Sequence, residues 1–241
     1  NLPDAWSTKG SSAQKPHLST IDVIECALEC LKQFRISTRR GGALPTDLLS
    51  SISIVAGKSP IEESMDAVPI TGQVLLNDDA NEVMILQIAN MEVTLQLRPE
   101  EDNHARDRVY SNTPVELGTV LLNTDEMQAS AMAHSGPADT GSVWSLSASF
   151  ACALQLGQLL LYKLDKVDRA ESNTLWMKKT YISFSDPMPF CGSVQPIHAT
   201  LEDVLKYTKA DGDWRRANVC ATFCNVQITC RVTHRLPAPP A

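Results

Sequence analysis

Hydrophobic residues near the start of the chain recur with the spacing of an α-helix. The stripe is formed by Ile21, Ile24, Leu28 and Leu31, widened by Val23, Ala27, Cys30 and Phe34. Ser19 precedes it and Asp22 follows three residues later, which is the capping-box spacing. This pattern predicts a helix that begins at Ser19 and packs on another element. A second short helix is predicted over Thr46–Ala56, with Gly57 placed to close it.

After Pro60 the hydrophobic period changes from about 3.6 residues to about 2, which is typical of strands. Two such runs, Val68–Leu76 and Val83–Leu97, flank a polar turn at 77–81 and predict a hairpin. The second run is too long for one strand, so we expect a break near residues 89–90. Val115–Leu122 predicts another strand, and residues 123–142 are expected to be a loop.

The most regular alternation follows, with Trp144, Leu146, Ala148 and Phe150 between serines, and it predicts a strand. Gly157 interrupts this run, and Leu159–Leu164 is expected to continue as a second strand. Later strands are predicted over Leu175–Phe184 and Val226–Thr233. Between them we expect a short helix that begins at Thr200, with Asp203 in the capping position, and a bulge near Phe223-Cys224.

These elements predict a mainly β fold, an antiparallel β-sandwich or jelly-roll-like architecture with two N-terminal helices and one short helix before the last strand. The predicted organisation is a flexible arm at 1–18, a helical segment at 19–60, a β-rich domain at 61–235 and a Pro-rich tail at 236–241. The sequence shows no internal repeat and no coiled-coil heptads.

Charge is distributed unevenly along a chain whose 43% hydrophobic and 20% charged residues are ordinary globular values. Residues 1–60 carry a net charge of +2, residues 61–139 carry −12, and residues 140–241 carry +3. The acidic middle argues against broad nucleic-acid binding, which needs a positive face. It is consistent either with contacts between oppositely charged parts of neighbouring copies or with solvated acidic loops.

Cysteine usage and hydropathy indicate the compartment. The seven cysteines are odd in number and irregular in spacing, which favours free thiols in a reducing, intracellular compartment (for a viral protein, the virion and the host cytoplasm). No apolar run approaches 18 residues, so no transmembrane segment is expected, and contact with a membrane surface stays open.

No catalytic, cofactor or metal site is predicted, because the phosphate-loop, dinucleotide and common hydrolase and metalloprotease motifs are absent. Four potential zinc ligands occur at Cys220, Cys224, Cys230 and His234, but a strand would place Cys224 and His234, which are ten residues apart, roughly 33 Å from each other. Buried thiols are therefore the preferred interpretation. A thiol nucleophile, base and orienting acid can be drawn from Cys191, His198 and Asp203, on weak grounds.

Paired cations are the remaining candidates for an interaction site with phosphate, lipid headgroups or an acidic neighbour. They are Arg39, Arg40, Lys178, Lys179, Arg215 and Arg216.

Three functional hypotheses follow. The first is a non-enzymatic, self-assembling structural protein, such as a viral coat or matrix-type subunit, because a sandwich with a flexible arm and tail suits contacts between copies. The second is a cytosolic module that binds a peptide or another protein. The third is a thiol hydrolase without a local motif. The expected partners are therefore copies of the chain or another protein.

Overall fold

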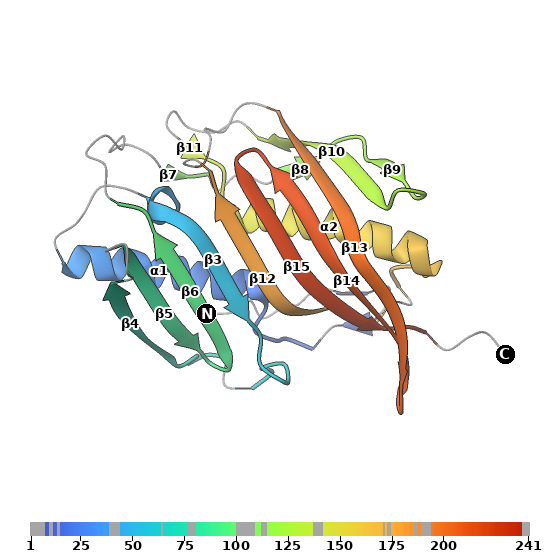
Figure 1. Ribbon diagram of the computed structural model, residues 1–241, viewed down its shortest axis with the longest axis horizontal. Helices are drawn as coiled ribbons and strands as arrows, with labels where there is room; N and C mark the ends of the chain where they lie inside the picture. Colours follow the sequence, from blue (N-terminus) through green and yellow to red (C-terminus); the bar gives the residue numbers. More distant parts are fainter. Residues whose placement is uncertain are drawn as a thin grey trace.

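One antiparallel sheet of eleven strands dominates the computed structural model, and two helices lie behind it in Figure 1. The order across the sheet is β4-β5-β6-β3-β12-β15-β14-β13-β10-β8, and β9 also pairs with β10. The structure describes residues 8–9, 12–13, 15–38, 44–63, 65–76, 81–99, 109–111, 115–136, 142–170, 172, 175–185, 188 and 194–237.

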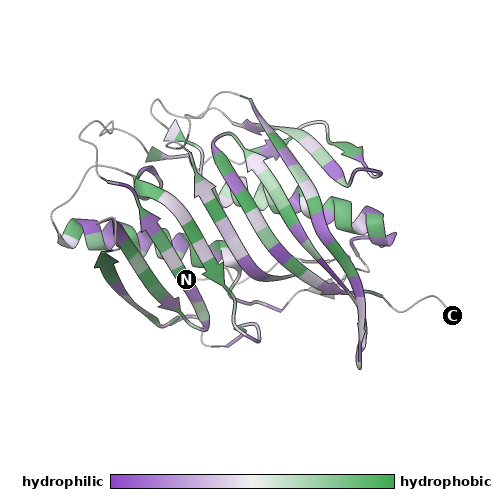
Figure 2. Ribbon diagram, viewed as in Figure 1, coloured by the Kyte–Doolittle hydropathy of each residue, from purple (hydrophilic) through white to green (hydrophobic). Residues whose placement is uncertain are grey.

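The strands of this sheet are β3 (Leu49–Val55), β4 (Ile70–Leu76), β5 (Glu82–Ile88), β6 (Met91–Leu97), β8 (Val115–Leu117), β9 (Leu121–Asn123), β10 (Gln128–Ser135), β12 (Trp176–Phe184), β13 (Gln195–Lys209), β14 (Gly212–Phe223) and β15 (Val226–Arg235). Two small pairs lie outside it: β1 (Thr8–Lys9) with β2 (Ser12–Ala13), and β7 (Val109–Tyr110) with β11 (Ser142–Val143). Along the large sheet, hydrophobic and hydrophilic residues alternate (Figure 2), which buries one face against the helices.

Helix α1 (Thr20–Ser37) begins where the sequence predicts. The side chain of Ser19 accepts a hydrogen bond from the backbone of Asp22, and the backbone N–H of Ser19 donates to the Asp22 carboxylate at 2.8 Å. This capping box satisfies N–H groups that a helix start otherwise leaves without partners. Val23, Ile24 and Leu31 are fully buried and join the single hydrophobic core.

Helix α2 (Leu146–Asp165) replaces the two strands predicted over residues 144–164, which is the largest error of the sequence prediction. Serines at every second position imitated the alternation of a strand. In the structure Ser145 caps the helix, and the Ser149 hydroxyl donates to the Ser145 carbonyl at 2.8 Å. A serine that bonds back to its own helix can be buried without a strand partner. Gly157 lies inside the helix and does not interrupt it.

Other local expectations were also wrong. The helix predicted over Thr46–Ala56 is a single 3-10 turn, η1 (Pro45–Leu48), followed by β3, whose isoleucines and valine suit a sheet. The expected loop at 123–142 contains β10, and the helix expected at Thr200 is the middle of β13. The predicted bulge at Phe223-Cys224 is a tight turn between β14 and β15.

The predicted sandwich or jelly roll is also wrong, although the mainly β, antiparallel character is confirmed. In the described part of the chain the inner face of one large sheet is covered by α1 and α2 and not by a second large sheet. The sandwich was predicted because α2 was interpreted as two strands. Without that helix, only a second sheet could have covered the buried face of the first. Neither helix, judged on the described residues, is long and apolar enough to cross a membrane.

The fold contains an internal duplication. In the first half, α1 is followed by β3, β4, β5 and β6; in the second half, α2 is followed by β12, β13, β14 and β15. Outward from the β3–β12 seam the orders are β3-β6-β5-β4 and β12-β15-β14-β13, which are equivalent. The register irregularity at Leu49/Ser51 in the first half corresponds to the one at Met177/Lys179 in the second.

Candidate functional site

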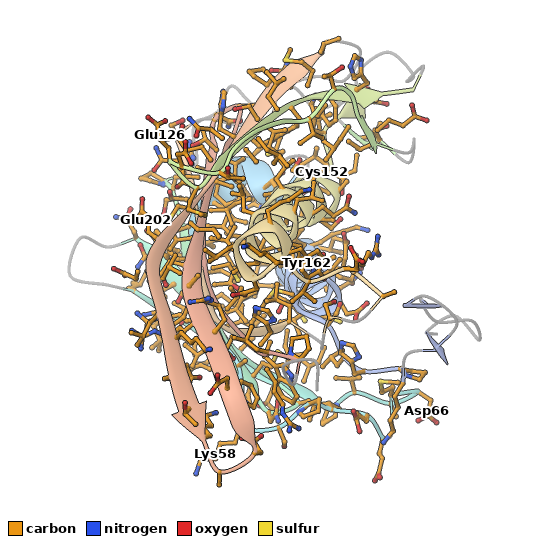
Figure 3. All side chains as sticks on the ribbon, turned by 90° about the vertical axis from the view of Figure 1, so that its right-hand side faces the viewer. Lys58, Asp66, Glu126, Cys152, Tyr162 and Glu202 are labelled. Atoms are coloured by element: carbon orange, nitrogen blue, oxygen red, sulfur yellow. The ribbon has the colours of Figure 1, made fainter. Side chains whose placement is uncertain are left out.

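The best-defined pocket lies beside the seam between the two halves. It has a volume of about 420 Å³ and is lined by the approach to α1 (15–20), the chain after β3 (within 56–62), Met91 at the start of β6, and the chain around the lower ends of β12, β14 and β15. Figure 3 views the molecule from the right-hand side of Figure 1, and Lys58, which lies between the lining residues Gly57 and Ser59, is labelled near the bottom of that view.

The floor of the pocket is apolar and its rim is cationic and aromatic. Leu18 and Met91 belong to the buried core, and Leu175 and Met177 contribute further apolar surface. The charged side chains of the lining are three cations, Lys15, Lys178 and Arg235, and two acids, Glu62 and Asp211, which leaves one net positive charge. The aromatic side chains are Trp176 and Trp214. Such a lining suits a ligand with an oily part and an anionic part.

The two tryptophans are held in place by neighbouring side chains. The Lys178 ammonium lies 5.1 Å from the centre of the Trp176 ring. The Trp214 indole N–H donates to Asp211 at 2.9 Å, and Lys209 lies 3.9 Å from the centre of its ring. These cation–π and hydrogen-bond contacts fix the rings at the rim before any ligand binds.

The N-terminus of α1 also faces the pocket, since Ser19 and Thr20 line it. The Asp22 N–H is used by the Ser19 cap at 3.2 Å. The N–H groups of the first helical turn have no partner within the helix, and they carry the positive end of its dipole. This end of the pocket therefore favours negative charge.

His17 is the titratable ring closest in sequence to that helix start. Its Nδ1 lies 3.1 Å from the Lys15 carbonyl oxygen. Because a carbonyl oxygen can only accept, Nδ1 donates, and the neutral ring then carries its lone pair on Nε2. The same segment is tied down by the Lys15–Glu62 ion pair at 2.6 Å and by the Leu18 N–H, which donates to the Ile61 carbonyl at 2.9 Å.

A buried charge cluster supports the opposite wall. Asp165, at the end of α2, accepts from Arg215 Nε at 2.9 Å and contacts His234 Nε2 at 3.1 Å. Burial by itself raises the pKa of Asp165, but the hydrogen bonds from His234 and Arg215 outweigh burial and lower it. Trp214 and Arg235 are the next residues along the two strands, so the cluster positions the rim of the pocket.

The residues predicted as candidates are scattered. Lys178 lines the pocket, Lys179 and Arg216 are exposed on the sheet, and Arg215 is engaged with Asp165. Arg39, Arg40 and Cys191 lie outside the described residues. His198 contacts the Ser130 hydroxyl at 2.8 Å, and Asp203 accepts from Asn218.

Six cysteines lie among the described residues, all as free thiols; Cys152 and Cys230 are buried and the other four are half-buried. Burial raises the pKa of Cys224 to about 11 and that of Cys230 to about 12, which disfavours thiolate chemistry. Among the described residues no group of three or more His, Cys, Asp or Glu side chains is arranged to hold a metal ion. His17, Trp214, Arg235 and the Asp165–His234 pair were missed by sequence reasoning, because no local motif links these distant positions.

Residues 1–114 and 120–237 match the protein family described as Pseudomonas avirulence D protein (AvrD). The chain belongs to the AvrD family. No curated protein matches this AvrD-family chain at a significant level.

Solved structures resemble the AvrD-family chain at low sequence identity. The tesB protein of Mycobacterium avium subspecies paratuberculosis is 10% identical with a TM-score of 0.52, over 94% of this chain and 90% of that one. An acyl-CoA thioesterase II, TesB2, from Mycobacterium marinum is 9% identical with a TM-score of 0.47, over 92% and 91%. A trans-AT polyketide synthase dehydratase domain from Brevibacillus brevis is 12% identical with a TM-score of 0.47, over 92% and 86%.

These comparisons correct the first functional hypothesis. Each half of the chain places one helix behind an antiparallel arrangement of four strands, and the tesB protein shares this fold. The chain belongs to a family of avirulence proteins and shares its fold with the tesB protein, and neither of these is described as a coat, capsid or matrix protein. The expectation of a non-enzymatic viral structural subunit is therefore wrong. The expected protein partners and intracellular location stay predictions.

Proposed function

We propose that this AvrD-family chain is an enzyme that transfers the acyl group of a thioester, with water as the simplest acceptor. The observation that carries the proposal is the composition of the pocket: an apolar floor, a cationic and aromatic rim, and a helix N-terminus beside a histidine. An acyl chain fits the floor formed by Leu18, Met91 and Met177, and the anionic carrier of the thioester fits Lys15, Lys178 and Arg235.

The chemistry assigned to the pocket uses groups that the chain itself supplies. His17 Nε2 takes a proton from water as its oxygen attacks the thioester carbonyl carbon. The first-turn N–H groups of α1, at Thr20 and Ile21, donate to the carbonyl oxygen as negative charge develops on it. The C–S bond then breaks, the protonated His17 returns the proton to the departing sulfur, and the products are a carboxylic acid and a free thiol.

The fold also supports this proposal. The tesB protein shares the arrangement over 94% of this chain, and one fold can carry different activities. What is particular to this chain is the set of side chains that converge on the pocket.

The test is thiol release from acyl-CoA esters, from butyryl to palmitoyl, by the full chain. We expect turnover that depends on acyl length, and binding that quenches the fluorescence of Trp176 and Trp214. His17→Gln should lower kcat by about 10²–10⁴-fold with a smaller change in KM, because it removes a proton-transfer group. His198→Gln, on the exposed Ser130 contact, is the matched control and should leave kcat unchanged.

Two results would overturn this function. If no ester were bound or cleaved, the pocket would not be a thioester site. If esters were cleaved equally well by the His17→Gln variant, catalysis would occur elsewhere in the chain.

A further inference from the structure

Three exposed cations lie together on the outer face of the second half, the face turned away from the helices. Lys179 on β12 is paired in register with Arg231 on β15, and Arg216 on β14 is diagonal to Arg231, because it pairs with Thr233. Directly opposed side chains in a sheet have Cβ atoms roughly 5 Å apart, and diagonal ones roughly 7–8 Å. We call Lys179, Arg216 and Arg231 the cationic patch.

Like charges at this spacing destabilise a sheet unless something compensates them. In the described part of the chain, none of the three cations makes an ion pair or a hydrogen bond to an acid. The nearest acids in register are two strands away on either side: Glu92 on β6 lies beyond Val55, and Glu202 on β13 lies beyond Asn218. The patch is therefore a concentration of positive charge on a chain whose net charge is −7.

The duplication shows that the fold does not require these cations. The Lys179–Arg231 pair directly follows the register irregularity of the second half. The equivalent pair of the first half, directly after its own irregularity, is Ser51–Gln96. Because the same scaffold position is uncharged in the first half, the cations of the second half point to binding.

The surroundings of the patch favour a protein partner. Tyr181 follows Lys179 by two residues on the same strand face and is 43% exposed, and Val55, which pairs with Lys179, is 42% exposed. Arginine and tyrosine beside exposed aliphatic surface are typical of protein interfaces. The patch also adjoins the pocket, since Trp176 pairs with Thr233 next to Arg216, and Trp176 lines the pocket rim.

We propose that the cationic patch docks an acidic carrier protein that delivers the acyl group to the pocket as a thioester on a flexible arm. This inference rests on the proposed function, because it names the protein that presents the substrate of that same site. Opposite charges would steer and orient the carrier, so the patch acts on the rate of association.

The experiment compares two donors of the same acyl group: octanoyl-CoA and a bacterial acyl carrier protein charged with octanoate. Arg231→Glu and Lys179→Glu should each lower kcat/KM for the carrier-bound donor by about tenfold or more, and added salt should reduce the wild-type rate on that donor. The rate on octanoyl-CoA should not change. Lys32→Glu, an exposed lysine of α1 paired with Glu29, is the control with the same charge change.

Several outcomes would overturn the docking proposal. If the substitutions lowered kcat/KM equally for both donors, the patch would be part of the pocket. If they lowered it for neither donor, the patch would have no role in binding the carrier. If no thioester is turned over, binding of the carrier protein without its acyl group is measured directly. Binding that is lost in Arg231→Glu would support docking without the proposed activity, and no wild-type binding would exclude it. Binding to vesicles of anionic phospholipid, without binding to the carrier, would assign the patch to a membrane.

Discussion

Asp165 concentrates more electrostatic interaction than any other single carboxylate described in the structure. Only 3% of its side chain is exposed, and its two oxygens are shared between Arg215 and His234. Removing one member of a buried charge cluster leaves the others without compensation, which costs more than the intact cluster contributes. The stability of the pocket wall therefore depends on the ionised form of this residue.

Asp165→Asn should lower the free energy of unfolding at neutral pH by about 3 kcal/mol, because Arg215 stays buried without an anion. The pKa of Asp165 is lowered in the fold, so its contribution is complete above its ordinary value of 3.8 and is lost as the pH falls through the folded pKa. Urea denaturation at a series of pH values should show the wild type and the variant converging in acid. Asp168→Asn, an exposed neighbour, should have little effect at any pH. A difference that persisted unchanged in acid would contradict this assignment.

The elements differ in how far their sequence determines them. Helix α1 and the β4–β5 hairpin were predicted because their signals are local: a capping box with one apolar stripe, and two alternating runs on either side of a polar turn. The break predicted near residues 89–90 separates β5 from β6. Helix α2 was not predicted, because serines at every second position look like the polar face of a strand. In the structure the Ser149 hydroxyl instead bonds to a carbonyl of its own helix. Strand β13 was missed because Asp203, which resembles a helix cap, instead accepts from Asn218 across the sheet.

The pocket could not be predicted for a related reason. Its residues come from segments centred near positions 17, 58, 91, 176 and 214, and only the pairing of β3 with β12 brings these together. The cations Lys178, Lys179 and Arg216 were visible in the sequence, but nothing local separated them from Arg215, whose guanidinium is used inside the molecule.

Gly157 shows how packing can reverse the preference of an element. In the middle of an exposed helix, replacing glycine with alanine stabilises by about 1 kcal/mol. Here a Cβ at position 157 would lie 2.5 Å from a methyl group of Val219 on β14. Gly157→Ala should therefore lower the free energy of unfolding by about 1–3 kcal/mol, the usual range for overpacking.

The double variant Gly157→Ala/Val219→Ala tests that cause. Removing the valine methyl groups creates room for the new Cβ, so the double variant should lose less than the sum of the two single losses. Thermal or urea unfolding of all four proteins gives the coupling energy. If the losses of the two single variants simply added in the double variant, the contact between position 157 and Val219 would not be the cause of the destabilisation.

At the scale of the whole molecule, the two halves keep one plan without a detectable sequence repeat. Both place the first strand after the helix at the seam, and both close their last hairpin with a left-handed residue before asparagine, Ala89 at φ 51° and Cys224 at φ 53°. The two halves differ in the side chains on the outer face of the sheet, which are cations in the second half and Ser51 and Gln96 at the equivalent pair of the first. The two halves therefore share one backbone plan, while only the second half carries the proposed binding surface.

The continuous sheet predicts that the halves unfold together. Three of the four tryptophans, Trp144, Trp176 and Trp214, belong to the second half, and Trp6 lies outside the described residues. Tryptophan fluorescence therefore reports mainly on the second half, whereas circular dichroism reports on both halves. Ala89→Val, in the first half, forces a β-branched residue into a left-handed backbone and should destabilise by about 1–2 kcal/mol, while Ala89→Gly should be tolerated. Because five registered pairs join β3 to β12 across the seam, we expect Ala89→Val to shift both transitions equally. A fluorescence midpoint that stayed at the wild-type value would mean that the seam joins two independent folding units, and the pocket beside it would then be open to relative motion of the halves.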